Sequence, residues 1–172
     1  MNPKGAYVGL DVHKDSISVA IADDIRQREV RFWGTISNES DQLEKLAHKL
    51  SIRYRQLNFF YEAGPCGYDV HRRLSAAGHP CTVVAPSHIP RKPGDRLKND
   101  HRDAIALARL AWAGELSPIW VPDTVHEAMR DVVRARHAAN KDLKAARQRI
   151  QSYLLKYRAI YPGKAWSGRH LT

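Results

Sequence analysis

Apolar residues near the start of the chain occur in short runs that suit β-strands rather than helices. Residues 5–12 form a nearly continuous apolar run, which is typical of a buried strand. Ile17, Val19 and Ile21 alternate with small or polar residues, as in a half-buried strand. Residues 28–33 suit a third strand. Because the links between these runs are short and turn-like, we predict an antiparallel meander.

The next part of the chain alternates between helical and strand-like patterns. The pattern predicts helices over 38–51, 68–77 and about 100–113, and strands over 57–61 and 81–85. Asn38 or Ser40 could cap the first helix, and Asp100 fits the N-cap of the last. Gly78 and Gly114 follow helix ends. The order β-β-β-α-β-α-β-α predicts an α/β, ribonuclease H-like fold: a mixed five-stranded sheet with flanking helices.

A long helix without glycine or proline is predicted from Asp123 to Tyr161. Its apolar positions step by four and three, with one polar interruption at Arg136, and form a heptad seam. The seam consists of Val125, Met129, Val132, Ala139, Leu143, Ala146, Ile150, Tyr153, Tyr157 and Ile160. At about 1.5 Å per residue the helix would be roughly 55–60 Å long, so we expect a coiled coil with a second copy or another segment. The alternative is an amphipathic helix folded back on the sheet.

These patterns divide the chain into three predicted parts. Residues 1–121 form the ribonuclease H-like domain, 122–161 the long basic coiled-coil helix, and 162–172 a tail that would begin a linker to a further domain. The length of 172 residues accommodates one ordinary domain with an appendage.

The net charge of the chain indicates which class of molecule it binds. The chain carries 28 Lys and Arg against 18 Asp and Glu, a formal net charge of +10. Residues 123–172 account for +7 of this charge. Such an excess predicts a polyanionic partner, most simply DNA or RNA. The alternative is a basic surface without a partner.

Four carboxylates occupy positions that suggest a metal centre. Asp11 ends the first strand and Glu62 ends the fourth, which should be its neighbour in the sheet. Asp100 and Asp103 share one face of the last predicted helix of the domain. Together they suit Mg²⁺ (or Mn²⁺), which prefers oxygen ligands and could support phosphoryl transfer. Singly, each has a duller explanation: a helix cap for Asp100, hydrogen bonds to a turn for Glu62, and a β-turn cap for Asp11.

Other polar residues are weaker candidates. His13, His88 and His101 lack a ligand-type spacing. The remaining notable carboxylates suit turns or the surface; they are Asp15, Asp23, Asp24, Asp69 and Asp95. No serine has an evident activating context.

Cysteine content and hydropathy indicate the cellular environment in which the protein is expected to work. Cys66 and Cys81 form neither a disulfide framework nor a CxxC pair, so a reduced intracellular protein without a zinc site is expected. No apolar run is long enough to cross a membrane, so no membrane partner is expected.

Basic side chains provide candidates for contacts with phosphate. They lie on the proline-containing loop 86–97, around the DxxD pair and on the long helix away from its apolar seam. These candidates are Arg91, Lys92, Arg96, Lys98, Arg102, Arg134, Lys141, Lys144 and Arg147. Solvated surface is an equal alternative for Arg102. No motif that would recognise a particular base sequence is evident in the chain.

Several segments resemble the DEDD-type transposases of insertion sequences. The resemblance runs through Gly9-Leu10-Asp11-Val12-His13-Lys14, residues 61–68, 93–104, 113–116, 120–123 and 134–136, and on to 161–166. It implies a RuvC-like front domain in which Asp11, Glu62, Asp100 and Asp103 match an acidic tetrad that binds Mg²⁺. It also implies dimerisation, or a higher assembly, through the long helix.

The resemblance further implies how such a protein would act. Members of the family recombine DNA by cutting and rejoining strands in the bacterial cytoplasm, some of them guided by a structured RNA. The resemblance also implies that the strand-joining serine lies in a C-terminal domain.

Two departures from the family pattern shape the expectation. Asn99 stands where the family usually has Thr. The chain closes at Leu171-Thr172, where the family would continue into a helical domain. We therefore expect a fragment, or the product of a decayed or frameshifted element, that binds metal and nucleic acid without completing strand exchange alone.

Three functional hypotheses follow. The first is the N-terminal half of a DNA transposase or recombinase. The second is a non-catalytic module, a truncated relic that dimerises and binds RNA or DNA. The third, an actin-like sugar kinase, needs glycines beside the first Asp, where His13 and Lys14 stand instead.

Overall fold

The computed structural model describes residues 5–23, 30–90, 99–159, 162–163 and 165–167. The chain separates into two compact units, Met1–Val121 and Pro122–Thr172. Within the described residues, no helix combines the length and the apolarity needed to cross a membrane.

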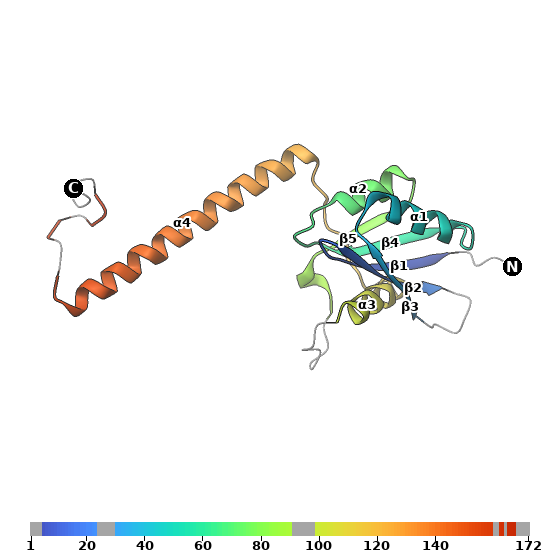
Figure 1. Cartoon of the computed structure of the whole chain (residues 1–172), viewed down its shortest axis with the longest axis horizontal. Helices are drawn as coiled ribbons and strands as arrows, with labels where there is room; N and C mark the ends of the chain where they lie inside the picture. The colour runs from blue at the N-terminus through green and yellow to red at the C-terminus, as the bar shows by residue number, and fades with distance from the viewer. Residues whose placement is uncertain (1–4, 24–29, 91–98, 160–161, 164, 168–172) are drawn as a thin grey trace. The chain divides into compact units, whose positions relative to one another are not determined.

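The first unit is built on a five-stranded mixed sheet (Figure 1). Its strands are β1 (Ala6–Val12), β2 (Ser16–Asp23), β3 (Val30–Ser37), β4 (Leu57–Glu62) and β5 (Cys81–Val84). The spatial order is β3-β2-β1-β4-β5, with β1, β2 and β3 antiparallel to one another in turn. β4 runs parallel to β1, and β5 runs parallel to β4. The predicted meander and the central position of the first strand are confirmed.

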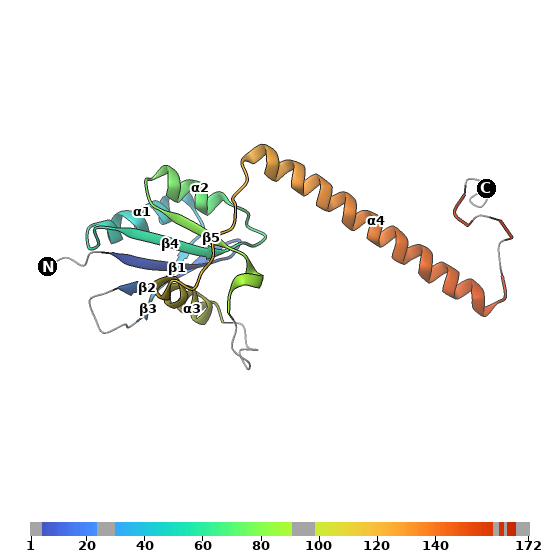
Figure 2. The ribbon, with the colours of Figure 1, turned by 180° about the vertical axis from the view of Figure 1, so that it is seen from behind.

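Helices cover both faces of this sheet. They are α1 (Ser40–Ser51), α2 (Asp69–Ala76), the short 3₁₀ turn η1 (Pro86–His88) and α3 (Asp100–Ala113). The two opposite views show α1 and α2 on one face and α3 on the other (Figures 1 and 2). This arrangement, with β1 at the centre, confirms the ribonuclease H-like α/β fold.

The two faces of β1 are packed in different ways. Val8 and Leu10 point into a large apolar core that includes Leu43 and Leu50 of α1, and all four are fully buried. On the opposite face, β1 carries Gly9 under α3.

Small residues allow α3 to lie close to the sheet. Ala20, Ala22, Ala104 and Ala108 form a second buried cluster between β2 and α3. A Cβ atom added to Gly9 would lie 2.4 Å from the Ala104 carbonyl oxygen and 2.5 Å from the Ala108 amide nitrogen. Glycine is therefore required here by the backbone of α3 itself.

Both predictions of helix N-caps were wrong, whereas Gly114 does form the C-cap of α3, with a φ of 72°. The N-cap of α3 is Asn99, whose side chain accepts a hydrogen bond from the His101 amide at 3.1 Å. Asp100 is therefore the first helical residue, and its carboxylate is available for other contacts. The N-cap position of α1 is Glu39, without a side-chain cap. The Asn38 side chain instead donates to the His13 carbonyl at 2.8 Å.

Asp23 was wrongly predicted to lie in a turn or on the surface. Its residue is only 3% exposed, and its carboxylate accepts hydrogen bonds from Arg31 at 2.8 Å and from the Tyr54 hydroxyl at 2.6 Å. Burial and the Asp23 carboxylate together raise the pKa of Tyr54 to about 12. The negative charge of Asp23 is tolerated in the protein interior because Arg31 of β3 and Tyr54, which follows α1, both bind it. These partners are 8 and 31 residues away in the sequence.

The other carboxylates that the sequence assigned to turns or the surface differ in outcome. Asp15 is exposed, and Asp69 is an ion-pair partner of Arg73 at 2.8 Å. Asp24 and Asp95 lie outside the described residues.

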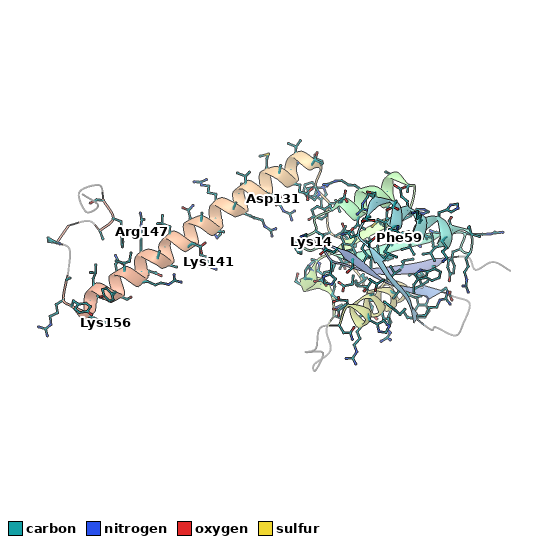
Figure 3. The ribbon with its side chains drawn as sticks, in the orientation of Figure 1. Lys14, Phe59, Asp131, Lys141, Arg147 and Lys156 are labelled. Carbon is teal, nitrogen blue, oxygen red and sulfur yellow. The ribbon has the colours of Figure 1, made fainter. Side chains whose placement is uncertain are left out.

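The second unit contains the long helix α4 (Thr124–Lys156), which has 33 residues. Asp123 caps its start by accepting a hydrogen bond from the His126 amide at 2.8 Å. None of its residues is buried, and its seam residues Met129 and Val132 are 63% and 69% exposed. Side chains extend along its length, including Asp131 and several basic residues (Figure 3).

The helix ends at Lys156, earlier than the predicted Tyr161. The Ala159 amide donates to the Leu154 carbonyl, and the Arg158 amide donates to the Leu155 carbonyl, both at 3.1 Å. Arg158 has a φ of 54°, in the left-handed region. These bonds form a Schellman motif. The stop was missed because this motif was formed without the glycine that usually signals it.

The close packing at Gly9 makes a direct prediction. The substitution Gly9→Ala should destabilise the first unit by about 2–3 kcal/mol, because the new methyl group collides with the backbone of α3. Chemical denaturation monitored by circular dichroism measures this loss. Gly5→Ala is the matched control, since its Cβ would meet only Gln56 atoms at 3.7 and 4.0 Å. Equal stability of the two variants would contradict the packing described for Gly9.

Candidate metal centre

The candidate centre begins where two parallel strands end side by side. Leu10 of β1 is in register with Tyr61 of β4, so Asp11 and Glu62 follow at the same level. Alternation along the strands places Asp11 on the face of Gly9 and Glu62 on the face of Phe60. Both belong to the face of the sheet that α3 covers. The strand-end positions predicted for these two carboxylates are confirmed.

The start of α3 brings Asp100 to Asp11 with a histidine between them. The Nε2 atom of His13 lies 3.0 Å from Asp11 Oδ2 and 3.1 Å from Asp100 Oδ1. One potential ligand atom from each of these three residues lies within 4.8 Å of the other two. The described part of the chain has this one group of three such residues close enough to hold an ion.

The two remaining acidic residues lie around this group rather than in it. Asp103 is half-buried one helical turn after Asp100, and its negative charge acts on Asp11. Glu62 is half-buried at the end of β4, next to Asp11 in the sheet. The three-residue group includes neither of them. The structure therefore brings Asp11 and Asp100 into direct proximity and places Glu62 and Asp103 beside them.

The electrostatics of the centre favour a cation. Burial raises the pKa of Asp11, the hydrogen bond and charge of His13 partly oppose this, and the charges of Asp100 and Asp103 raise it further. A negative charge on Asp11 is thus disfavoured when no cation is bound. Carboxylate oxygens with one imidazole nitrogen form a donor set that fits a divalent ion. The residues present are consistent with a divalent metal.

A network of hydrogen bonds holds the backbone of His13 in place. Its amide donates to the Ser16 carbonyl at 2.8 Å, which closes the turn between β1 and β2. Its carbonyl accepts from Asn38, whose side-chain oxygen accepts from Arg73 of α2 at 3.0 Å. Arg73 pairs with Asp69 on the same helix at 2.8 Å. The position of His13 is therefore supported from the opposite face of the sheet.

His13 was not predicted to belong to this group, because the spacing of the histidines is not typical of metal ligands. The usable signal was the Asp11-Val12-His13 pattern, because residues two apart in an extended segment point to the same side. His101, by contrast, packs its ring against Phe32 with the centroids 4.1 Å apart.

The predicted phosphate-binding residues are distributed over several regions. Arg91, Lys92, Arg96 and Lys98 lie outside the described residues. Arg102 is exposed near the start of α3. On α4, in the second unit, Arg134, Lys141 and Lys144 are exposed, and Arg147 contacts the ring of Trp166 at 5.5 Å from its centroid. Figure 3 labels Lys141 and Arg147 on this helix.

The class of this domain follows from its ribonuclease H-like sheet and its acidic residues. These carboxylates lie at the ends of β1 and β4 and at the start of α3. Comparison with known proteins identifies the family within that class. A family model described as a transposase, for DEDD transposases of the IS110 type, matches residues 8–159. The chain belongs to this transposase family.

Two curated relatives are similar over nearly the whole chain. "Putative transposase y4qE" of Sinorhizobium fredii is 48% identical over 167 residues, which is 96% of this chain and 43% of the relative. The transposase for insertion sequence element IS1533 of Leptospira borgpetersenii is 35% identical over 168 residues, 95% of this chain and 48% of the relative. The chain thus spans less than half the length of these relatives.

Solved structures show more distant similarity. RuvC of T. thermophilus in complex with a Holliday junction substrate has a TM-score of 0.43 at 12% identity, covering 66% of this chain and 99% of that one. The large terminase nuclease of the thermophilic phage G20c has a TM-score of 0.42 at 16% identity, covering 60% and 80%.

The raised pKa of Asp11 predicts how metal-free stability depends on pH. Because its folded-state pKa is above 3.8, the folded protein holds the proton more tightly than the unfolded chain. The resulting stabilisation is lost as the pH rises from 3.8 through the raised value. Asp11→Asn removes this loss, so at pH 7 with a chelator the variant should unfold at a higher temperature than the wild type.

Asp41→Asn is the matched control for this prediction. The exposed Asp41 pairs with Lys45, which lowers its pKa, so its substitution should bring no gain in stability at neutral pH. Thermal denaturation between pH 3 and pH 8 compares the two variants with the wild type. A lower melting temperature of Asp11→Asn than of the wild type at pH 7 would contradict the electrostatic account.

Proposed function

We propose that this chain is the metal-binding part of an insertion-sequence transposase that cuts and joins DNA. The observation that carries the proposal is the approach of Asp11 and Asp100, from separate elements, in a chain of the transposase family. Carboxylates collected at one edge of a sheet repel one another unless a cation joins them. A divalent ion is therefore the natural partner of this centre.

In this proposal the four acidic residues share the work of holding the ion. Asp11 from β1 and Asp100 from α3 are direct ligands, and Glu62 from β4 and Asp103 from α3 complete the site. Mg²⁺ or Mn²⁺, when bound, would activate an attacking oxygen and stabilise a leaving oxygen in phosphoryl transfer. Because the acidic residues fix the position of the ion, they would also position the scissile phosphate that binds to it. Strand joining would further need the serine of a C-terminal domain, as the family resemblance implies.

The charge of the chain supports nucleic acid as the partner. A net charge of +10 favours binding to a polyanion, and most of it lies in residues 123–172. The exposed Lys141 and Lys144 of α4 would contact the DNA backbone or a structured guide RNA. The exposed Arg102 near the start of α3 would contact phosphate, and the sequence proposes Arg91, Lys92, Arg96 and Lys98 as further phosphate contacts. On α4, Arg134 and Arg147 would also contact nucleic acid.

The apolar seam of α4 supports assembly of two or more copies. Leu143 and Ile150 are both 47% exposed, and Tyr153 is 59% exposed. Large apolar side chains repeated every three and four residues are stabilised when a second helix covers them. A second copy of this chain offers the same repeat and is the proposed partner.

Metal-dependent stabilisation tests the proposed centre. Saturating Mg²⁺ or Mn²⁺ should raise the melting temperature of the wild type by roughly 5–10 °C, because an ion at about 100 times its dissociation constant adds about 2.7 kcal/mol. Asp11→Asn should lose this response, whereas Asp41→Asn should keep it. Differential scanning calorimetry with and without the ion measures the shift.

Binding to duplex DNA, followed in parallel, separates the proposed function from its alternative. The wild type and Asp11→Asn should both bind, with affinity that falls steeply as salt increases. Binding without any response to divalent ions would instead support a non-catalytic module that dimerises on RNA or DNA.

Self-association through α4 is tested by substitutions on its seam. Leu143→Asp combined with Ile150→Asp should convert the assembly to a monomer, because charges replace apolar contacts between helices. Analytical ultracentrifugation across a range of concentrations measures the change. Gln148→Asp, at a position off the seam, is the matched control and should leave the assembly intact. A wild type that is monomeric at high concentration would contradict the proposal.

A further inference from the structure

A single ring nitrogen of His13 contacts two carboxylates that come from different elements of the fold. Its Nε2 atom lies at nearly the same distance, 3.0 and 3.1 Å, from carboxylate oxygens of Asp11 and Asp100. A ring nitrogen carries at most one hydrogen, so Nε2 cannot donate a linear hydrogen bond to both oxygens at once. At most one of the two contacts is therefore a linear hydrogen bond, and both carboxylates compete for the same ring nitrogen.

The same distances suit three ligands of one ion. In an octahedral site with metal–ligand bonds of about 2.1 Å, adjacent ligand atoms lie about 3.0 Å apart. The contacts from Nε2 to the two oxygens match this spacing, and all three atoms lie within 4.8 Å of one another. An ion at the centre of this group would contact each of them.

We propose that His13 is a direct ligand of the cation, through Nε2, and that it gives the centre a preference for Mn²⁺ over Mg²⁺. This inference rests on the proposed metal centre and adds a residue to it. Mg²⁺ is a hard ion that strongly prefers oxygen. Of these two ions Mn²⁺ is the less hard, so one imidazole nitrogen among oxygen ligands favours Mn²⁺ over Mg²⁺.

The surroundings of His13 prepare it for this role. Its amide and its carbonyl are both held, by Ser16 and by Asn38, and Asn38 is held by Arg73. The backbone therefore stays in place whether or not the ring contacts a carboxylate. The side chain is about one-third exposed, so an ion can reach it from solvent. A ligand fixed in this way loses little conformational freedom when the ion binds.

A competing role for His13 makes the opposite prediction. As a protonated counter-ion, it would neutralise Asp11 and Asp100 only until a metal ion displaced it. Removing the imidazole would then increase the affinity for both Mg²⁺ and Mn²⁺. As a ligand, it contributes to Mn²⁺ binding, and its removal decreases that affinity. The sign of the change therefore decides between the two roles.

The experiment measures Mn²⁺ binding to the full chain by electron paramagnetic resonance of free Mn²⁺. His13→Gln should weaken Mn²⁺ binding at least about tenfold, in line with the loss of a supporting metal contact. Its affinity for Mg²⁺, measured by competition, should change much less. Electron spin echo envelope modulation should show coupling of bound Mn²⁺ to a ¹⁴N nucleus in the wild type and lose it in His13→Gln. His88→Gln, which replaces an exposed histidine of η1, should behave as the wild type.

The outcomes distinguish this inference from the proposed function on which it rests. Unchanged or tighter Mn²⁺ binding by His13→Gln, or the absence of ¹⁴N coupling in the wild type, overturns the role of His13. If Asp11→Asn still weakens Mn²⁺ binding in that case, the metal centre itself stands. If Mn²⁺ does not bind, or binds equally to Asp11→Asn, the proposed centre fails together with the inference.

Discussion

The close contact between α3 and β1 is the constraint on which the candidate centre depends. Gly9 has no room for a side chain, because the backbone of α3 occupies the space where a Cβ would lie. Alanines at 104 and 108 continue this small surface along the helix. The start of α3 is thereby held near the carboxyl end of β1, and Asp100 meets Asp11 and His13 there. A larger residue at position 9 would collide with the backbone of α3 and displace Asp100 from Asp11 and His13.

Asp23 and Asp11 are both shielded from solvent, but their surroundings differ. Asp23 is buried with Arg31 and Tyr54, so its partners are permanent and its role is structural. Asp11 is surrounded by other acids and a single histidine, and burial raises its pKa. The first arrangement is complete within the chain. The second lacks such a permanent counter-charge, so under the proposed function it would gain stability from a bound cation.

The second unit differs from the first in its packing, because no residue of α4 is buried. Every residue of α4 is at least partly exposed, including the apolar residues of its seam. Its polar faces carry basic residues that suit a phosphate backbone, and its seam suits another helix. This unit therefore exposes both its apolar and its basic side chains, whereas the first unit encloses a core and carries its acidic group at one edge of the sheet.

The sequence by itself determined the order of the elements, the strand-end positions of Asp11 and Glu62, and the shared helix of Asp100 and Asp103, since each follows from local periodicity. It did not reveal that Asn99 caps α3, that Asp23 is buried, that α4 stops at Lys156, or that His13 joins the acidic group. Only the tertiary structure decided these points. Each depends on partners distant in sequence or on backbone geometry that several residue types can adopt, and periodicity carries no information about either.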